Sequence, residues 1–168
     1  MPKNGKGQTS RKASGIGTDI RSLERLVGAW RLSGEAKGLI SYEWAEGGNF
    51  LLQRFDIEVF GRNIRGIEVI GRLRPHGEEP SREIWSRAYS FLDGLTLDYV
   101  YELLGETLII WFRRKGSDNR MTGSFGPGDD TLTGAWAWPG GGYRFTWTRV
   151  NARIDSGSAA RLRRSPRS

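Results

Sequence analysis

The sequence predicts an all-β protein: a closed antiparallel up-and-down β-barrel of about ten strands, with one short helix before it and a basic tail at each end. Three observations carry this prediction. From Trp30 onward apolar side chains alternate with polar ones, the connections are mostly short and rich in Gly, Asp and Pro, and no segment could form a crossover helix. A parallel α/β sheet is therefore excluded.

The one helical segment is expected directly before the strands. Apolar residues recur at helical spacing between Ile20 and Val27, Asp19 can cap the start of this segment, and Gly28 can end it.

The strands then follow one another at short intervals. Ten are expected, at 29–36, 38–46, 49–60, 63–73, 82–92, 95–103, 106–114, 119–126, 131–138 and 142–150. Turns such as Gly47-Gly48 and Asp93-Gly94 have hairpin length, whereas residues 74–81 contain two prolines and predict a longer loop. An open meander would leave two unpaired edges, so closure into a barrel is favoured.

Composition limits the chemistry that this chain can perform. Its 168 residues contain no Cys and one His, His76. A disulfide framework, a thiolate zinc site, a cysteine nucleophile and any centre that needs two imidazoles are therefore excluded. No metal or cofactor is expected. The sequence also lacks an apolar run of membrane-spanning length, and the first 18 residues lack a signal-peptide core, so we expect a cytoplasmic protein.

The net charge of +7 lies in the two tails. Residues 1–18 carry four basic and no acidic side chains, and residues 151–168 carry five basic and one acidic, which leaves −1 for residues 19–150. We expect disordered tails on either side of a single domain at 19–150. The near-neutral domain argues against specific nucleic-acid binding. Whether the Arg-rich tail contacts RNA or anionic lipid, or is only nonspecifically sticky, stays open.

A wide barrel can hold one small ligand, and aromatic rows on several strands could line it. Seven Trp in one small domain are many, and their rings bury large areas while keeping a polar N–H. Arg87 lies between Trp85 and Tyr89 on one strand face and could hold a carboxylate or phosphate by a forked contact. The expected ligand-binding residues are Trp44, Arg54, Trp85, Arg87, Tyr89 and Trp147. Alternatively, these rings fill the interior, or the arginines face solvent and stack on their neighbours.

Acidic residues leave an enzymatic alternative open. Glu68 or Glu102, together with Tyr99 or Tyr101, could perform general acid–base chemistry if they converged inside a cavity. Surface placement or ion pairing is the plainer interpretation of these acids, and of Glu43 beside Trp44. No residue is therefore assigned a catalytic role.

Several segments resemble a bacterial family of lipocalin-like domains of unknown function. They are LERLVGAWRLSGEA at 23–36, ISYEWAEGGNFLLQRFDIEVFG, IRGIEVIG and TLTGAWAWPGGGYRFTW, and the resemblance covers about 20–150. The resemblance implies a calycin-type barrel in which Trp30 of Gly28-Ala29-Trp30 packs across one end. Nitrobindin-like haem proteins have a similar opening, but they ligate iron through a histidine near the C-terminal end, and no histidine follows His76 here.

The sequence thus favours a barrel that binds a small, partly apolar or amphipathic molecule, one that could carry an anionic group. The alternative is a small-barrel enzyme that acts on a bound hydrophobic substrate by general acid–base chemistry. Ligand identity, oligomeric state and the role of the tails are not encoded in recognisable motifs.

Overall fold

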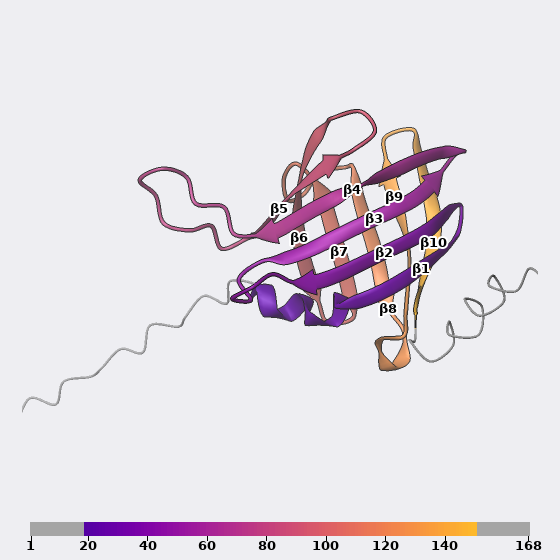
Figure 1. Ribbon diagram of the computed structural model, residues 1–168, viewed down its shortest axis with the longest axis horizontal. Coiled ribbons are helices and arrows are strands. Elements are labelled where there is room, and N and C mark those ends of the chain that lie inside the picture. The colour runs from indigo at the N-terminus through magenta and orange to yellow at the C-terminus, as the bar shows by residue number, and fades with distance from the viewer. Residues whose placement is uncertain (1–18, 151–168) are drawn as a thin grey trace, which may run out of the picture.

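The computed structural model describes residues 19–150, which form a closed barrel of ten antiparallel strands (Figure 1). The strands are β1 Gly28–Gly34, β2 Ala36–Trp44, β3 Leu51–Val59, β4 Arg62–Gly71, β5 Ile84–Ser90, β6 Thr96–Leu104, β7 Thr107–Phe112, β8 Arg120–Phe125, β9 Thr131–Trp138 and β10 Gly141–Arg149. The predicted fold class is confirmed. The predicted disordered tails, 1–18 and 151–168, lie outside the described residues.

Each strand pairs with its neighbours in sequence, and β1 pairs with β10 to close the sheet. The closing register runs from Trp30 opposite Arg149 to Gly34 opposite Phe145. Because side chains alternate across a strand, closure gives every strand one row inside the barrel and one row outside. In β1, for example, Trp30 and Leu32 are buried whereas Arg31 is exposed.

Glycines allow the closest approaches between strands. A Cβ atom on Gly66 would lie 2.1 Å from the carbonyl oxygen of Tyr89, and one on Gly134 would lie 2.1 Å from that of Thr122. Glycine at these two positions lets neighbouring backbones bend around the barrel without a clash.

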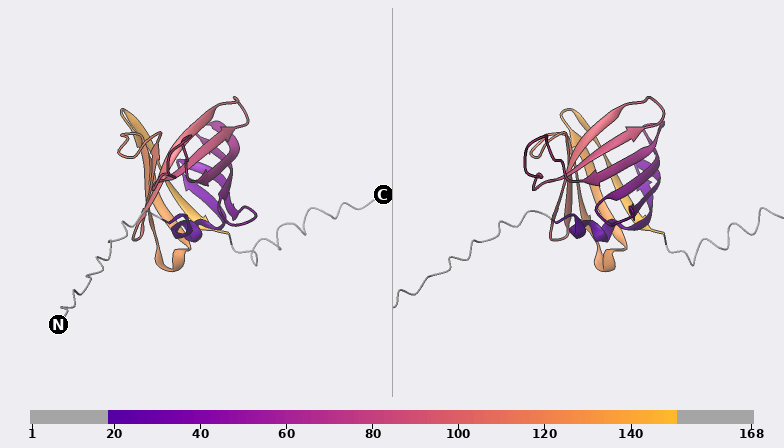
Figure 2. Two further views of the ribbon diagram at one scale, coloured as in Figure 1. Left: turned by 90° about the vertical axis from the view of Figure 1, so that its left-hand side faces the viewer. Right: turned by 60° about the vertical axis from the view of Figure 1, so that its left-hand side comes forward.

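One end of the barrel is covered by a 3-10 helix, η1 Ile20–Leu26 (Figures 1 and 2). Asp19 caps it as predicted, because its side chain accepts a hydrogen bond of 3.1 Å from the Arg21 amide. The element is shorter and tighter than the predicted helix. It ends at Leu26, and Gly28, with φ of +116°, already belongs to β1.

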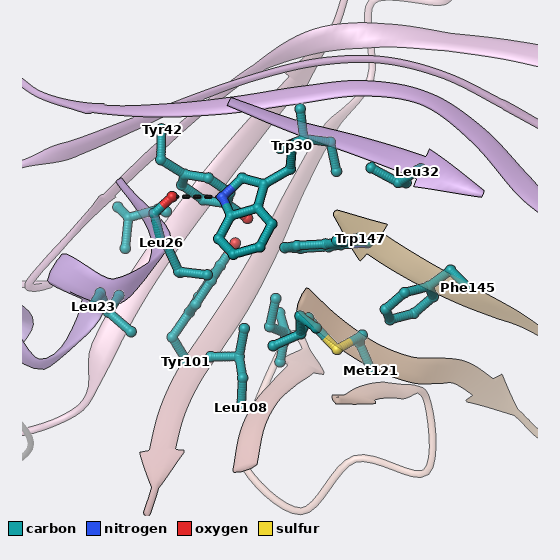
Figure 3. Close-up of a cluster of buried hydrophobic side chains, with 14 of the residues drawn as sticks. Leu23, Leu26, Trp30, Leu32, Tyr42, Tyr101, Leu108, Met121, Phe145 and Trp147 are labelled. Atoms are coloured by element: carbon teal, nitrogen blue, oxygen red, sulfur yellow. Dashed lines mark hydrogen bonds between the residues drawn. The ribbon is translucent and has the colours of Figure 1, made fainter. Parts of the chain in front are cut away.

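The side chains that face the barrel interior next to this helix seal the barrel end (Figure 3). Trp30 is fully buried, its ring lies against Leu26 in the core cluster, and its Nε1 donates a 2.8 Å hydrogen bond to the Leu26 carbonyl. The Arg149 guanidinium stacks 4.2 Å from the centre of the Trp30 ring. That guanidinium also donates to the main-chain carbonyls of Arg25, Val27 and Asp129. The indole and the guanidinium together fix η1 to the barrel.

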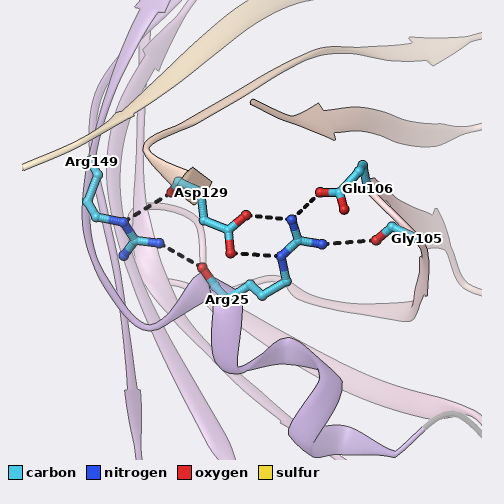
Figure 4. Close-up of polar contacts among 5 residues, drawn as sticks. All are labelled: Arg25, Gly105, Glu106, Asp129 and Arg149. Carbon is cyan, nitrogen blue, oxygen red and sulfur yellow. Dashed lines mark hydrogen bonds and ion pairs between the residues drawn. The ribbon is translucent and has the colours of Figure 1, made fainter. Parts of the chain in front are cut away.

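A second arginine ties η1 to two turns of the barrel (Figure 4). Arg25 Nε donates a hydrogen bond to Asp129 in the short helix η2 Pro127–Asp129. The same guanidinium forms an ion pair with Glu106 and donates a 2.9 Å hydrogen bond to the Gly105 carbonyl. The hydrogen bond from Arg25 holds the pKa of the Asp129 carboxyl below its usual value. The opposite end of the barrel has no such cover among the described residues, and its walls diverge there (Figure 2).

This closed end predicts a large effect of one ring. Trp30→Ala should lower the free energy of unfolding by about 3–5 kcal/mol, because it opens a cavity and removes the surface on which Arg149 stacks. Leu104→Ala is the control, since Leu104 is 56% exposed and its loss should cost about 0.5 kcal/mol or less. Denaturant unfolding measures both. Equal small losses would show that the ring does not hold the end.

Candidate functional site

The interior holds a cavity of about 710 Å³ that opens at the end opposite η1. Every one of the ten strands contributes at least one side chain to its wall. This volume lies within the range of small-molecule sites, roughly 300–1,000 Å³. The cavity is therefore the candidate functional site.

Small side chains on β5 help to form this cavity. The inward row of β5 consists of Ile84, Ser86, Ala88 and Ser90, and both Ala88 and Ser90 line the cavity. Larger inward side chains at these positions would occupy the space beside the cross-strand partners Glu68 and Gly66. The hollow is a consequence of residue size on one strand.

The wall opposite β5 is aromatic. Phe145 and Trp147 on β10 have ring centres 5.6 Å apart, and Trp136 on β9 reaches across to meet Tyr99 of β6, the neighbour of β5, edge-on at 5.8 Å. The Nε1 of Trp136 donates a 2.6 Å hydrogen bond to Asn119, so this ring is held in place. The wall offers broad apolar surface with fixed geometry.

Polar side chains gather at the inner end, above the core that seals the barrel. Tyr42 is the cross-strand partner of Gln53, and Gln53 is the partner of Glu68. All three are buried and point inward, and Gln53 Nε2 donates a 2.6 Å hydrogen bond to the Tyr42 hydroxyl. Ser86 and Tyr101 complete this group, which we call the inner polar cluster: Tyr42, Gln53, Glu68, Ser86 and Tyr101. Figure 3 shows Tyr42, Tyr101 and Trp147 converging here.

Hydrogen bonding in this region is incomplete. Among the described residues, Glu68 Oε1, Ser86 Oγ and Trp147 Nε1 are buried and have no hydrogen-bond partner of good geometry. Glu68 and Trp147 both line the cavity. A buried polar atom without a partner costs about 1–3 kcal/mol, so these atoms are the natural contacts of a bound molecule.

Burial dominates the electrostatics of the cluster. It raises the pKa of Glu68 to about 7, and the hydroxyls of Ser86 and Tyr101 offset part of that increase. Burial and the nearby Glu68 carboxylate raise the pKa of Tyr42, Tyr99 and Tyr101 above the usual value for a phenol. The tyrosines therefore stay neutral, and Glu68 exchanges its proton near neutral pH.

The mouth is ringed by exposed and half-buried apolar side chains. Phe60 lies edge-on to Trp138 and Tyr143, with ring centres 6.4 and 6.1 Å away. Arg62 and Asp93 add charge at the same end. Within residues 19–150, Arg62 is the one cationic side chain on the cavity wall.

The structure places the six predicted ligand-binding residues in different surroundings. Trp147 lies on the cavity wall, on the same row as Tyr143 and Phe145. Trp44 lies at the closed end, where its Nε1 donates a 2.5 Å hydrogen bond to the Glu24 carboxylate. The Arg21 guanidinium lies over the Trp44 ring, 4.5 Å from its centre.

The other four lie on the outer face of the barrel. Arg54 is exposed and pairs with Glu43 at 3.8 Å, and Arg87 makes a forked pair with Asp98 at 2.7 and 2.9 Å. Tyr89 is 41% exposed. Trp85, the partner of Val100 in β6, shares this outer row. The alternative in which Arg87 faces solvent is therefore what the structure shows.

A small outer cluster explains why the rings of β5 do not point inward. Val100 is 1% exposed although it points away from the cavity, because its cross-strand partners are Trp85 and Trp111. These two indoles cover it, and Lys115 lies 5.5 Å from the Trp111 ring. Aromatic content alone therefore does not identify the inward row.

The acids also separate into two groups. Glu68 lies inside with Tyr99 and Tyr101, whereas Glu102 points outward and pairs with Lys115. His76 is exposed in the loop between β4 and β5. Gln53 and Ser86 were not predicted as site residues. The feature of the sequence that could have identified them is a polar residue at a strand position whose neighbours in the same row face the barrel interior.

Comparisons with known proteins do not assign the chain to a family. No protein-family model matches the chain, and no curated protein matches it in sequence. The closed antiparallel barrel is compatible with a calycin-like fold. In the described part of the chain no helix has the length and apolar character needed to cross a membrane, and no three His, Cys, Asp or Glu side chains gather as metal ligands.

The pKa of Glu68 predicts how stability changes with pH. A carboxyl whose pKa is raised by folding stabilises the protein fully below its unfolded value and loses that contribution as pH rises through the folded value. The free energy of unfolding should therefore fall by on the order of 3 kcal/mol between about pH 4.5 and pH 7. Glu68→Gln should remove most of this slope, whereas Glu102→Gln should retain it. Denaturant unfolding at several pH values measures the difference, and the same slope in both variants would contradict the assignment.

Proposed function

We propose that this barrel binds a small, largely apolar molecule in its cavity, with the polar end of the molecule at the inner polar cluster. The observation that carries the proposal is the combination of a cavity of about 710 Å³ with buried polar atoms on its wall that lack partners among the described residues. A cavity that existed only through imperfect packing would be expected to be apolar and small. The polar atoms favour a site that a ligand completes.

The balance of surfaces supports an amphipathic ligand. Apolar and aromatic side chains make up most of the wall, so burial of the ligand body supplies most of the affinity. Glu68 Oε1 can accept a hydrogen bond and Trp147 Nε1 can donate one. A ligand with a donor and an acceptor near one end would satisfy both atoms.

Of the predicted ligand-binding residues, Trp147 has a direct place in this proposal. Trp44 supports the closed end, and Arg54, Trp85, Arg87 and Tyr89 belong to the outer surface. An anionic group on the ligand would find its nearest cavity-lining cation, among residues 19–150, in Arg62 at the mouth.

A pair of neighbouring positions on β5 provides the test. Ala88→Trp places an indole in the cavity beside Glu68 and should weaken binding of the neutral dye Nile red by about tenfold or more. Arg87→Trp places the same ring on the outer face, where it removes only a solvent-exposed ion pair, and should leave binding unchanged.

Dye fluorescence titrations on both variants and on the wild type measure the affinities. No dye binding by the wild type, or equal binding by both variants, would contradict a site in the cavity. Mass spectrometry of the purified protein under native conditions would in addition detect a molecule retained there.

A second candidate function rests on the convergence of Glu68 and Tyr101. The carboxyl of Glu68, with a pKa of about 7, lies beside the Tyr101 hydroxyl inside a cavity, as the acid–base alternative requires. Glu68 would accept a proton from a bound substrate, and Tyr101 would donate a hydrogen bond to the developing charge. Support for this function would be exchange of a carbon-bound hydrogen of a retained molecule with solvent deuterium, lost in Glu68→Gln while binding persists.

A further inference from the structure

The inner end of the cavity is rich in hydrogen-bond acceptors and has no cation of its own. Among the described residues that line the cavity, Glu68 is the one charged side chain at this end, because Arg62 and Asp93 lie at the mouth. Glu68 is 5% exposed, and no Lys or Arg of the described residues lines the cavity at this end. A buried carboxyl without a cationic partner is costly when ionised.

Aromatic rings surround this carboxyl. Tyr42 and Trp147 have ring centres 6.3 Å apart, and both belong to the buried cluster at the inner end. The faces of such rings attract cations, most strongly where water is excluded. A carboxylate acceptor next to aromatic faces is a setting that suits a positively charged group.

We infer that the inner polar cluster receives an ammonium group carried on an apolar body, with Glu68 as its counter-ion. The inference rests on the proposed binding function and assigns the chemical class of the ligand. The ammonium would donate to Glu68 Oε1, which lacks a hydrogen-bond partner of good geometry, and the hydroxyl oxygens of Tyr42 and Tyr101 offer further acceptors. The apolar body would lie along Phe145 and Trp147 toward the mouth.

Other classes of ligand are expected to bind less tightly at this end of the cavity. A carboxylate placed here would face Glu68 without a nearby cation, so it would bind only with its charge at the mouth or after protonation of one partner. An alcohol could donate one hydrogen bond to Glu68, but it would add no opposite charge. The expected order of affinity is therefore amine, then alcohol, then carboxylate.

Proton exchange couples to this preference. The groups that face Glu68 are Tyr42 on β2, Gln53 on β3, Ser86 on β5, and Tyr99 and Tyr101 on β6. Since the tyrosines stay neutral over the accessible range, Glu68 alone among them titrates near neutral pH. An ammonium prefers the ionised carboxylate, so amine affinity should rise as the pH increases through about 7.

Three probes of equal chain length, decylamine, decanol and decanoate, test the inference by displacement of Nile red. Decylamine should bind at least about tenfold more tightly than decanol at about pH 8.5, and its advantage should shrink at about pH 6. Glu68→Gln should weaken decylamine by about ten- to a hundredfold and leave decanol nearly unchanged. Glu102→Gln, an acid on the outer face, is the matched control and should leave both affinities unchanged.

The outcomes separate this inference from the proposed function. If the wild type binds Nile red but decanol or decanoate displaces it as well as decylamine, at both pH values, the assignment of an amine is overturned and binding in the cavity stands. If the wild type binds neither dye nor probe, the proposed function fails, and the inference fails with it. The pH comparison on the wild type needs no substitution, so a poorly folded Glu68→Gln variant would not prevent a decision.

Discussion

The pairing of β1 with β10 is the constraint on which the rest of this structure depends. That pairing turns a chain of hairpins into a single closed wall, and it fixes which residue of every strand points inward. A shift of one residue would move Trp30 and Trp147 outside. The stacking of Arg149 on Trp30 joins the two strands at this seam and, through main-chain carbonyls, also attaches η1. The same residues, Trp30 and Arg149, therefore both close the barrel and seal one of its ends.

Because one end is sealed and the other is not, the two ends of the interior differ in side-chain packing. Large apolar side chains fill the space below η1, and the filling stops where β5 presents Ser86 and Ala88 instead of larger residues. At that boundary the register places Tyr42, Gln53 and Glu68 side by side on three neighbouring strands. The cavity thus has an apolar body and an acidic, hydrogen-bonding inner end. Its chemistry follows from cross-strand register, not from any contiguous motif.

Alternation and turn chemistry were sufficient to predict the barrel, because both are local properties of the chain. Alternation also agrees with the common inward face of Tyr143, Phe145 and Trp147. The inward row of β5 could not be chosen in the same way. Trp85 and Tyr89 are the larger apolar side chains, yet Trp85 covers Val100 on the outside, a contact between residues on different strands. Glu68 was considered as a buried acid, but its partners Gln53 and Ser86 become visible only when strands are set in register.

The central claim is that a single carboxyl is held in a poorly solvated interior at the end of a ligand-sized cavity. Carbon-detected NMR titration of the side-chain carboxyls, with the Glu68 signal assigned by its loss in Glu68→Gln, tests that claim directly. A midpoint of about 7 for Glu68 agrees with the structure. A midpoint near the ordinary value of about 4.5 would mean that water reaches this carboxyl freely and that the inner end is not the enclosed site described here.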